Sequence, residues 1–319
     1  MADLRIAVIG CGGIANREHY RALAGFPEVE VMGACDLDAE RVAATADRWE
    51  IGGRYTDYRA MVEAEAPDAV YVILRPHHLF DVAAWCLDQG LDTFFEKPAG
   101  VCTYQTRSLA RIAERRGCLT MVGYNRRHSP LLNACRELVA ARGPLIQCVS
   151  CGYIPHGDRP AYYEGALDIL HCHGTHYLDT LRWLAGEVTG IASQVRADRE
   201  FATGWFALTR HEGGCTGVSM LSWAVGGGRP YSFELHGEGI SVFADLTGRH
   251  EVLIEGERDD QALAQFGPPP PDNPLAHYGF AEENRHFIDC LLRRTEPSSS
   301  LSDAVKTMEL ADRVYRAAR

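Results

Sequence analysis

The sequence predicts an α/β fold class in which an N-terminal, doubly wound parallel sheet is followed by an α+β domain with a large, open, mostly antiparallel sheet. Two observations support this prediction. Apolar runs typical of buried strands alternate with helical patterns as far as residue 124. From about residue 145 the segments become short, rich in β-branched or aromatic residues and separated by glycine-bearing turns, which is typical of antiparallel strands.

The first apolar run, residues 5–9, leads into the glycine cluster GCGGIA at 10–15. An apolar run without polar alternation predicts a strand buried on both faces, as in a parallel sheet. Gly10 permits a tight turn, Gly12 lets the backbone approach a pyrophosphate, and Ala15 allows helix and strand to pack closely. The helix predicted at about 14–25 directs its N-terminal amide groups at the phosphates. This spacing predicts a Rossmann dinucleotide site, with cofactor contacts at Gly10, Gly12, Gly13 and Ile14.

A second apolar strand, at 29–35, ends at Asp36. This position is about 20 residues beyond the glycines, where a ribose-binding carboxylate belongs. Such a carboxylate accepts hydrogen bonds from the ribose diol and repels a 2′-phosphate, so Asp36 favours NAD over NADP. No arginine occupies position 37 or 38, and Arg41 is the cation that remains within reach of a 2′-phosphate.

Strands and helices continue to alternate after Asp36. Asp38 is suited to cap a helix that extends to about Trp49. Further helices are predicted at 58–64, 79–89 and 103–116, and further buried strands at 69–74, 91–95 and 119–122. Loop signals follow these strands as RPHH at 75–78, EKP at 96–98 and GYNRR at 123–127. In a doubly wound sheet the ligand site lies along these carboxyl ends.

The second half of the chain is predicted to form the open sheet, with a helix inserted after its first strand. The helix is predicted at 168–184, and 267–274 is a proline-rich surface loop. Two helices, near 275–293 and 302–318, close the chain, and the last is expected to return to the first domain. The strands are predicted at 145–153, 189–198, 203–211, 214–224, 230–237, 239–245 and 249–256.

Bulk properties set limits on the class of protein. The chain of 319 residues exceeds a usual single core, so two domains are expected, at 1–124 and 125–319. The net charge of −11 argues against a nucleic-acid surface, which requires clustered Lys and Arg. No apolar run is long enough to cross a bilayer, and no signal peptide is expected. The 11 cysteines show no repeated CxxC spacing, so free thiols and a cytoplasmic location are expected.

The EKP segment places a lysine where a ligand is expected. Lys97 follows a buried strand, at the ligand edge of the predicted sheet. A lysine beside a bound dinucleotide is suited to hold or relay a proton on a substrate hydroxyl. The alternative is a surface lysine that forms an ion pair with Glu96.

A second polar group lies on the helix predicted at 168–184. Asp168, Cys172, His176 and Asp179 are spaced so that they line one helical face. A neutral histidine one turn from a carboxylate or thiol is a plausible general base. One alternative is a zinc site formed by His171, Cys172, His173 and His176, although adjacent helical residues cannot all face one ion. Another is a helix N-terminus whose histidines bind local backbone.

The third group follows the last strand of the parallel sheet. Asn125 is suited to bind the carboxamide of a nicotinamide or a sugar hydroxyl. Arg126 and Arg127 are suited to bind anionic substrate groups. The alternative for either arginine is a salt bridge between the domains.

With these segments together, the chain resembles the Gfo/Idh/MocA family, the glucose–fructose oxidoreductase and inositol dehydrogenase group. The resemblance implies a Rossmann domain, an open-faced sheet domain that often forms the oligomer interface, and NAD(P)-dependent hydride transfer at a ring hydroxyl of a sugar or cyclitol. Lys97 matches the family's substrate-contacting lysine and His176 its catalytic histidine. The motifs that carry the resemblance are GCGGIA at 10–15, RPHH at 75–78, EKP at 96–98, GYNRRHSP at 123–130 and GTHYLDTLRWL at 174–184.

The sequence departs from the family pattern at two places. The family commonly has Asp four residues before the catalytic histidine, where this chain has Cys172, so His173 or Asp168 is expected to support His176. At the end of the strand predicted at 69–74, the family usually has Thr-Pro and a histidine near the position of Phe80, whereas this chain has Arg75-Pro76. An arginine there implies an anionic substrate or a different grip on the dinucleotide.

We therefore predict an NAD-dependent dehydrogenase, with NADP less favoured, that acts on a secondary alcohol of a sugar, sugar derivative or cyclitol. His176 is expected to take the hydroxyl proton, and Lys97 to hold that oxygen and contact the cofactor. No resident metal is expected. The remaining expected cofactor contacts are Arg75, His78, Glu96 and Asn125, and the residues expected to fix other hydroxyls are Arg127, Tyr153 and Tyr163.

A catalytically silent dinucleotide-binding regulator or sensor on the same fold is the main alternative, because fold does not determine function. Cys172 favours this alternative, and intact Lys97 and His176 argue against it. A metal-dependent enzyme built on the histidine cluster is a third interpretation. A homodimer or homotetramer through the C-terminal sheet is expected, because strand 214–224 can bury a face against a partner subunit.

Overall fold

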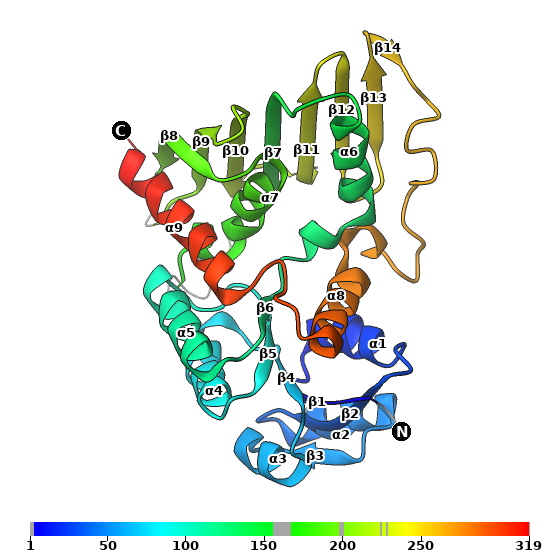
Figure 1. Ribbon diagram of the computed structural model, residues 1–319, viewed down its shortest axis with the longest axis vertical. Helices are drawn as coiled ribbons and strands as arrows, with labels where there is room; N and C mark the ends of the chain where they lie inside the picture. Colours follow the sequence, from blue (N-terminus) through cyan, green and yellow to red (C-terminus); the bar gives the residue numbers. More distant parts are fainter. Residues whose placement is uncertain (1–2, 156–166, 198–200, 224, 228, 319) are drawn as a thin grey trace. The chain divides into compact units, whose positions relative to one another are not determined.

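The computed structural model describes residues 3–155, 167–197, 201–223, 225–227 and 229–318 (Figure 1). The chain divides into two compact units, Met1–Gly123 with Phe280–Val305 and Tyr124–Gly279 with Lys306–Arg319. These units differ from the domain boundaries expected from the sequence, because a segment near the C-terminus returns to the first unit. That segment contains helix α8 (Phe280–Arg293), whereas most of the last helix, α9 (Leu301–Ala317), belongs to the second unit.

The first unit is built on a six-stranded parallel sheet with the order β3-β2-β1-β4-β5-β6. The chain reverses its winding direction between the adjacent strands β1 and β4, so the sheet is doubly wound, as predicted. The three-residue strand β3 was not predicted as a strand. The strands are β1 (Leu4–Ile9), β2 (Val29–Cys35), β3 (Gly53–Tyr55), β4 (Ala69–Val72), β5 (Asp92–Phe95) and β6 (Thr120–Val122).

The helices of the first unit follow the predicted alternation. Asp38 accepts hydrogen bonds from the backbone amides of Glu40 and Arg41 and thereby caps α2, as predicted. The first helix opens with a π-helical turn, which the sequence did not predict. The helical segments are η1 (Ala15–His19), α1 (Tyr20–Leu23), α2 (Ala39–Trp49), α3 (Tyr58–Glu65), α4 (Pro76–Asp88), α5 (Thr103–Arg116) and α8.

Helix α8 and the segment after it complete the core of the first unit. Phe287, Ile288 and Leu291 of α8 are buried in the same apolar cluster as β1 and β4. After the helix, the backbone amide of Val122 donates to the carbonyl of Ser299, so the chain follows the end of β6. This burial of about three large side chains stabilises the association of α8 with the sheet by several kcal/mol.

The second unit contains an eight-stranded sheet with the order β14-β13-β12-β11-β7-β10-β9-β8. The neighbours β7 and β10 are parallel and all other pairs are antiparallel, which confirms the mostly antiparallel prediction. The strands are β7 (Gln147–Ile154), β8 (Val188–Arg196), β9 (Gly204–His211), β10 (Thr216–Trp223), β11 (Arg229–Gly237), β12 (Ile240–Asp245), β13 (His250–Ile254) and β14 (Glu257–Arg258).

Helices cover one face of this sheet (Figure 1). Helix α6 (Pro130–Ala140) packs on β11 and β12, and α7 (Thr175–Ala185) packs on β7 and β10. The helix predicted at 275–293 is interrupted at Gly279, where a Cβ atom would lie 2.4 Å from the carbonyl oxygen of Asn125. Its first part is the short η5 (Ala276–Tyr278), and its second part is α8.

Candidate functional site

The glycine turn after β1 is tightly packed at Gly10 and has free space beside Gly12 and Gly13. Gly10 has φ +121°, and a Cβ atom there would lie 2.2 Å from the carbonyl oxygen of Ile73, so only glycine fits. At Gly12 and Gly13, by contrast, an added Cβ atom would meet no other atom within 4 Å. The backbone of these two residues is therefore accessible to a ligand, which is what a pyrophosphate at this turn requires.

Asp36 is held beside this turn at the end of β2. Its Oδ2 accepts a hydrogen bond of 2.9 Å from the backbone amide of Cys11, and its Oδ1 accepts one of 3.1 Å from the amide of Asp38. Arg41, the nearest candidate for a 2′-phosphate, forms an ion pair of 3.0 Å with Asp38 instead. The carboxylate is half-buried, so it keeps an exposed edge for a ribose hydroxyl.

The RPHH segment lies at the carboxyl end of β4 and begins helix α4. Arg75, His77 and His78 are exposed, and the two imidazole rings lie 4.0 Å apart between centroids. Burial of part of the ring and the neighbouring His78 and Arg75 lower the pKa of His77. The predicted cofactor contacts Arg75 and His78 are thus on the ligand edge of the sheet and accessible.

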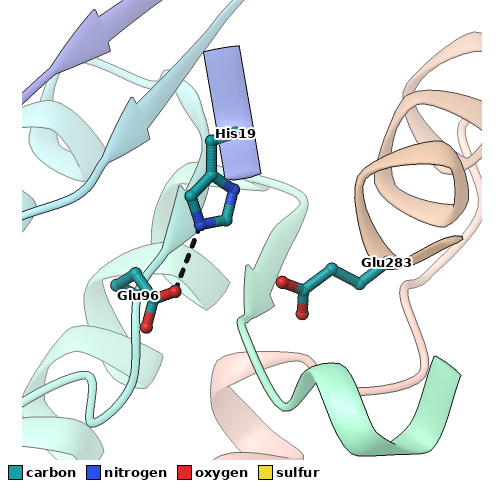
Figure 2. A group of neighbouring side chains, drawn as sticks. All are labelled: His19, Glu96 and Glu283. Carbon is teal, nitrogen blue, oxygen red and sulfur yellow. Dashed lines mark hydrogen bonds and ion pairs between the residues drawn. The ribbon is translucent and has the colours of Figure 1, made fainter. Parts of the chain in front are cut away.

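The EKP segment orients its glutamate and its lysine differently. The buried Glu96 side chain accepts from the Lys97 amide at 3.0 Å and lies 3.1 Å from Nε2 of His19 (Figure 2). Lys97 is half-buried, and within the described residues its ammonium group has no hydrogen-bond or ion-pair partner. The ion pair between Lys97 and Glu96, which was the alternative interpretation, is not formed. The lysine is therefore available to a ligand at the carboxyl end of β5.

The helix predicted at 168–184 is irregular at its beginning. Asp168 precedes the helix and accepts hydrogen bonds from the backbone amide and from Nδ1 of His171, at 2.9 and 2.6 Å. The next turn, η4 (Leu170–Gly174), is π-helical, so the predicted single regular α-helix is interrupted. His176 and Asp179 both lie on the regular helix α7, and Asp179 accepts from Arg127. The common face of Asp168, Cys172, His176 and Asp179 stays a prediction.

His176 lies in the first turn of α7 and is 9% exposed. Its ring centroid lies 6.2 Å from that of His173, whose ring also contacts Trp223 at 5.1 Å. Cys172 is buried on the same segment. His171 is held between Asp168 and Asp312, with Nε2 at 2.9 Å from Asp312, so it is not directed at His173 or His176. A zinc site that includes His171 and those two histidines is therefore not assembled.

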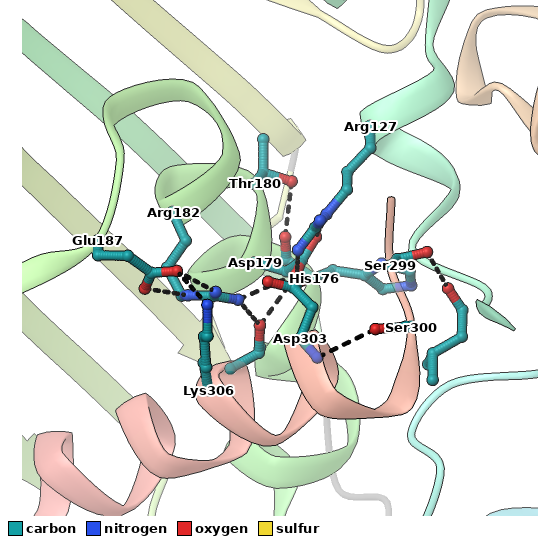
Figure 3. Close-up of polar contacts among 12 residues, drawn as sticks. Arg127, His176, Asp179, Thr180, Arg182, Glu187, Ser299, Ser300, Asp303 and Lys306 are labelled. Atoms are coloured by element: carbon teal, nitrogen blue, oxygen red, sulfur yellow. Dashed lines mark hydrogen bonds and ion pairs between the residues drawn. The ribbon is translucent and has the colours of Figure 1, made fainter. Parts of the chain in front are cut away.

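The GYNRR side chains are held inside the second unit. Arg127 donates to Asp179 from Nε at 2.8 Å and from Nη2 at 2.5 Å, which forms a buried bidentate ion pair (Figure 3). Arg126 is 2% exposed, with its guanidinium carbon 4.0 Å from the ring centroid of Tyr231. Asn125 donates to the carbonyl of Tyr278 at 2.9 Å. Asn125 and Arg127, which were expected to bind ligands, thus have partners within the protein. Nη1 of Arg126 is buried without a hydrogen-bond partner among the described residues.

Tyr153 is half-buried on β7, and Tyr163 lies outside the described residues. The sequence did not identify Glu283, Asn284 or His19, which surround Glu96 in the first unit. No sequence signal marks them, because they are separated from one another along the chain and have ordinary helical neighbours. Within the described part of the chain, no helix is long and apolar enough to span a membrane.

The doubly wound sheet and its open glycine turn define a dinucleotide-binding fold. Residues 4–124 match the family described as "Oxidoreductase family, NAD-binding Rossmann fold", and residues 145–243 match the "GFO/IDH/MocA C-terminal domain". These two ranges cover more than half of the chain. The chain belongs to the Gfo/Idh/MocA family and is a dehydrogenase of this family.

Relatives with assigned names extend the comparison. The chain is 29% identical to a D-apiose dehydrogenase of Paraburkholderia graminis, over 98% of this chain and 87% of the relative. It is 31% identical to an inositol 2-dehydrogenase of Saccharopolyspora erythraea, over 61% of this chain and 58% of the relative.

Solved structures show the same fold. A levoglucosan dehydrogenase in complex with NADH and L-sorbose has a TM-score of 0.86 at 16% identity, over 100% of this chain and 97% of that one. A 3-ketoreductase of Actinomadura kijaniata in complex with NADP has a TM-score of 0.78 at 22% identity, over 99% and 98% of the two chains.

Proposed function

We propose that this protein is an NAD-dependent dehydrogenase that acts on a secondary hydroxyl of a sugar, sugar derivative or cyclitol. The observation that carries the proposal is the half-buried Lys97 ammonium group at the carboxyl end of β5, which has no partner among the described residues. The names of the relatives, which act on D-apiose and inositol, support this substrate class.

The cofactor site fits NAD. The open backbone at Gly12 and Gly13 accommodates a pyrophosphate, and Asp36 offers carboxylate oxygens to a ribose diol. Because Arg41 is engaged by Asp38, no cation beside Asp36 is assigned to a 2′-phosphate. Arg75 and His78 are proposed to lie along the cofactor on the same edge of the sheet. We therefore propose NAD over NADP, which predicts a higher kcat/KM with NAD.

The two proposed catalytic residues act on the same hydroxyl group. Bound NAD supplies the acceptor for the hydride that leaves the carbinol carbon. The neutral His176 imidazole takes the hydroxyl proton and becomes imidazolium. The Lys97 ammonium donates a hydrogen bond to the same oxygen and stabilises the negative charge that develops on it. The oxygen is left as a carbonyl, so one proton and one hydride balance the reaction.

The remaining site residues are assigned supporting roles. We propose that Cys172 and His173 shape the surroundings of His176, since the family carboxylate is absent at position 172. Asp168 is bound by His171, so its support of His176 is indirect. Tyr153 is kept as a candidate for binding substrate hydroxyls. Arg127 is proposed to fix this region through Asp179 rather than by donating directly to substrate.

The decisive experiment follows NAD reduction by absorbance against a panel of sugars, uronates and inositols. Lys97 and Lys306 are the only lysines in the sequence, so Lys306→Ala is the matched control for Lys97→Ala. We expect Lys97→Ala and His176→Ala each to lower kcat at least 100-fold, the scale of acid–base and oxyanion contributions, and Lys306→Ala to change it little.

The outcomes separate the enzyme from the sensor. Turnover that is lost in both variants supports the dehydrogenase and names its substrate class. Tight NAD binding without turnover on any polyol, in either direction, contradicts the proposal and favours a dinucleotide-binding regulator, with Cys172 as the first residue to replace by Asp.

We also propose that the uncovered face of the second sheet forms a homodimer or homotetramer. Leu208 is 55% exposed and is paired in register with the half-buried Val218 across β9 and β10. Apolar side chains exposed on a sheet favour association. Sedimentation of a monomer at working concentration would contradict this proposal.

A further inference from the structure

A polar cluster lies inside the first unit, behind the EKP turn. It consists of His19 from η1, Glu96 from the end of β5 and Glu283 from α8 (Figure 2). Their exposed fractions are 0%, 8% and 0%, and one ligand atom from each lies within 4.8 Å of the others. The cluster is distinct from the glycine turn and from His176.

Hydrogen bonding determines how His19 faces the cluster. The amide nitrogen of Asn284 donates to the carbonyl of Phe280 at 2.7 Å, so its Oδ1 faces Nδ1 of His19, at 3.3 Å. Because an amide oxygen only accepts, Nδ1 carries the proton and a neutral His19 presents a lone pair at Nε2. That lone pair lies 3.1 Å from Oε1 of Glu96, which is also an acceptor. The contact is attractive when a proton on Nε2 or a cation lies between the two atoms.

Glu283 adds a second carboxylate to the same space. Both of its oxygens are buried without a hydrogen-bond partner in the described residues, and they are directed toward His19 and Glu96 (Figure 2). An ionised carboxylate in this environment is strongly destabilised unless a cation accompanies it.

We propose that Nε2 of His19 and the carboxylates of Glu96 and Glu283 bind one zinc ion. Imidazole nitrogen and carboxylate oxygen are zinc ligands, and one Zn²⁺ neutralises both carboxylates. Ligand atoms of a tetrahedral zinc site lie roughly 3.3 Å apart, which the contact between His19 and Glu96 already matches at 3.1 Å. The bound ion would hold a carboxylate oxygen of Glu283, which lies within 4.8 Å of the other two ligand atoms.

The surrounding residues provide the outer support that such a site needs. Asn284 fixes the tautomer of His19, and the backbone amide of Lys97 donates to Oε2 of Glu96. The His19 ring also packs against Phe94, with 5.2 Å between centroids. The ligands come from three segments far apart in the sequence, so the ion connects α8 to β5 and η1. Its role is structural and does not depend on the proposed dehydrogenase activity.

The test uses the full chain, stripped of metal with a chelator and titrated with Zn²⁺ in a calorimeter. We expect one ion per chain and, at a hundredfold excess over Kd, a rise in melting temperature of roughly 5–10 °C. Glu283→Gln and His19→Gln are expected to abolish both effects. Glu282→Gln, an exposed neighbour of Glu283, is the matched control and is expected to bind zinc like the wild type.

Cobalt distinguishes this site from adventitious binding to cysteine. Co²⁺ in the proposed site shows d–d absorption without the thiolate charge-transfer band that cysteine ligands produce. The proposal is overturned if the wild-type chain shows no saturable binding at one ion per chain, a result that needs no variant to fold. It is also overturned if Glu283→Gln and His19→Gln bind zinc as the wild type does. Absence of metal together with an unchanged melting temperature in Glu283→Gln would instead assign a proton to Glu283.

Discussion

Replacing Asp179 by Asn removes the carboxylate at the centre of the buried ion pair in the second unit. Asp179 is 1% exposed, and it accepts from Arg127 at 2.8 and 2.5 Å and from Thr307 at 2.9 Å. The side chain of Arg127 is 7% exposed. The Asp179→Asn variant therefore keeps one acceptor oxygen but removes the negative charge that Asp179 presents to the buried Arg127 guanidinium.

The expected loss follows from this burial. Removing one partner of a buried ion pair costs about 3–5 kcal/mol, because the remaining charge is uncompensated. The asparagine oxygen still accepts one hydrogen bond, so we expect the lower end, about 3 kcal/mol. The control is Glu255→Gln, whose ion pair with Arg142 spans 3.2 Å and leaves Glu255 72% exposed. Such exposed pairs contribute about 0–1 kcal/mol.

Urea unfolding followed by tryptophan fluorescence measures this difference, because Trp183, Trp205 and Trp223 all lie in the second unit. Adding Arg127→Met to Asp179→Asn removes the buried guanidinium charge, and the double variant is expected to recover part of the lost free energy of unfolding. A loss of under about 1 kcal/mol in Asp179→Asn, equal to that of Glu255→Gln, would refute the argument from burial.

Two further outcomes are expected. Gly10→Ala should lower the free energy of unfolding by at least about 2 kcal/mol, since its Cβ atom would lie 2.2 Å from the carbonyl oxygen of Ile73. The Gly12→Ala variant should have the free energy of unfolding of the wild type but bind NAD at least tenfold more weakly in a fluorescence titration. Equal free energies of unfolding in Gly10→Ala and Gly12→Ala would contradict the difference inferred between the two glycines. Burial lowers the pKa of His171, but Asp168 and Asp312 outweigh it and raise the pKa above its ordinary value. The contribution of His171 to stability is therefore complete below pH about 6.5 and is lost as the pH rises through the raised pKa. The His171→Gln substitution should consequently lower the melting temperature more at pH 6 than at pH 9. An equal loss of melting temperature at the two pH values would contradict this argument.

The parallel sheet was predictable because its signals are local. Each buried strand is a continuous apolar run, and residues such as Asp38 mark where helices begin. The strand β3 lacks such a run, since its three residues are Gly-Arg-Tyr. The irregularities were also missed: Gly279 interrupts a helical pattern because of residues around position 125, and the π-helical turn at 170–174 has no sequence signature.

The positions of Gly10, Gly12, Asp36 and Lys97 followed from motif spacing, because each lies next to the end of its own strand. Side-chain pairing was not predictable in the same way. Arg127 meets Asp179 across 52 positions, and His19 meets Asn284 across 265 positions. Only the folded chain determines such partners, so the pairing of Arg127 with Asp179 was not predictable from the sequence.

The two border strands of the eight-stranded sheet, β14 and β8, leave fewer backbone groups free for pairing with another strand than long, uncovered borders would. The border strand β14 has two residues, and β8 forms a bridge at Ser193 with Ala318, which follows α9. Short or partly covered borders offer fewer free backbone groups for strands of other chains. Growth into open-ended fibrils by edge pairing is therefore disfavoured. The proposed self-association through the broad face is of a different kind, because two copies that bury the same surface close the assembly at a defined number of subunits.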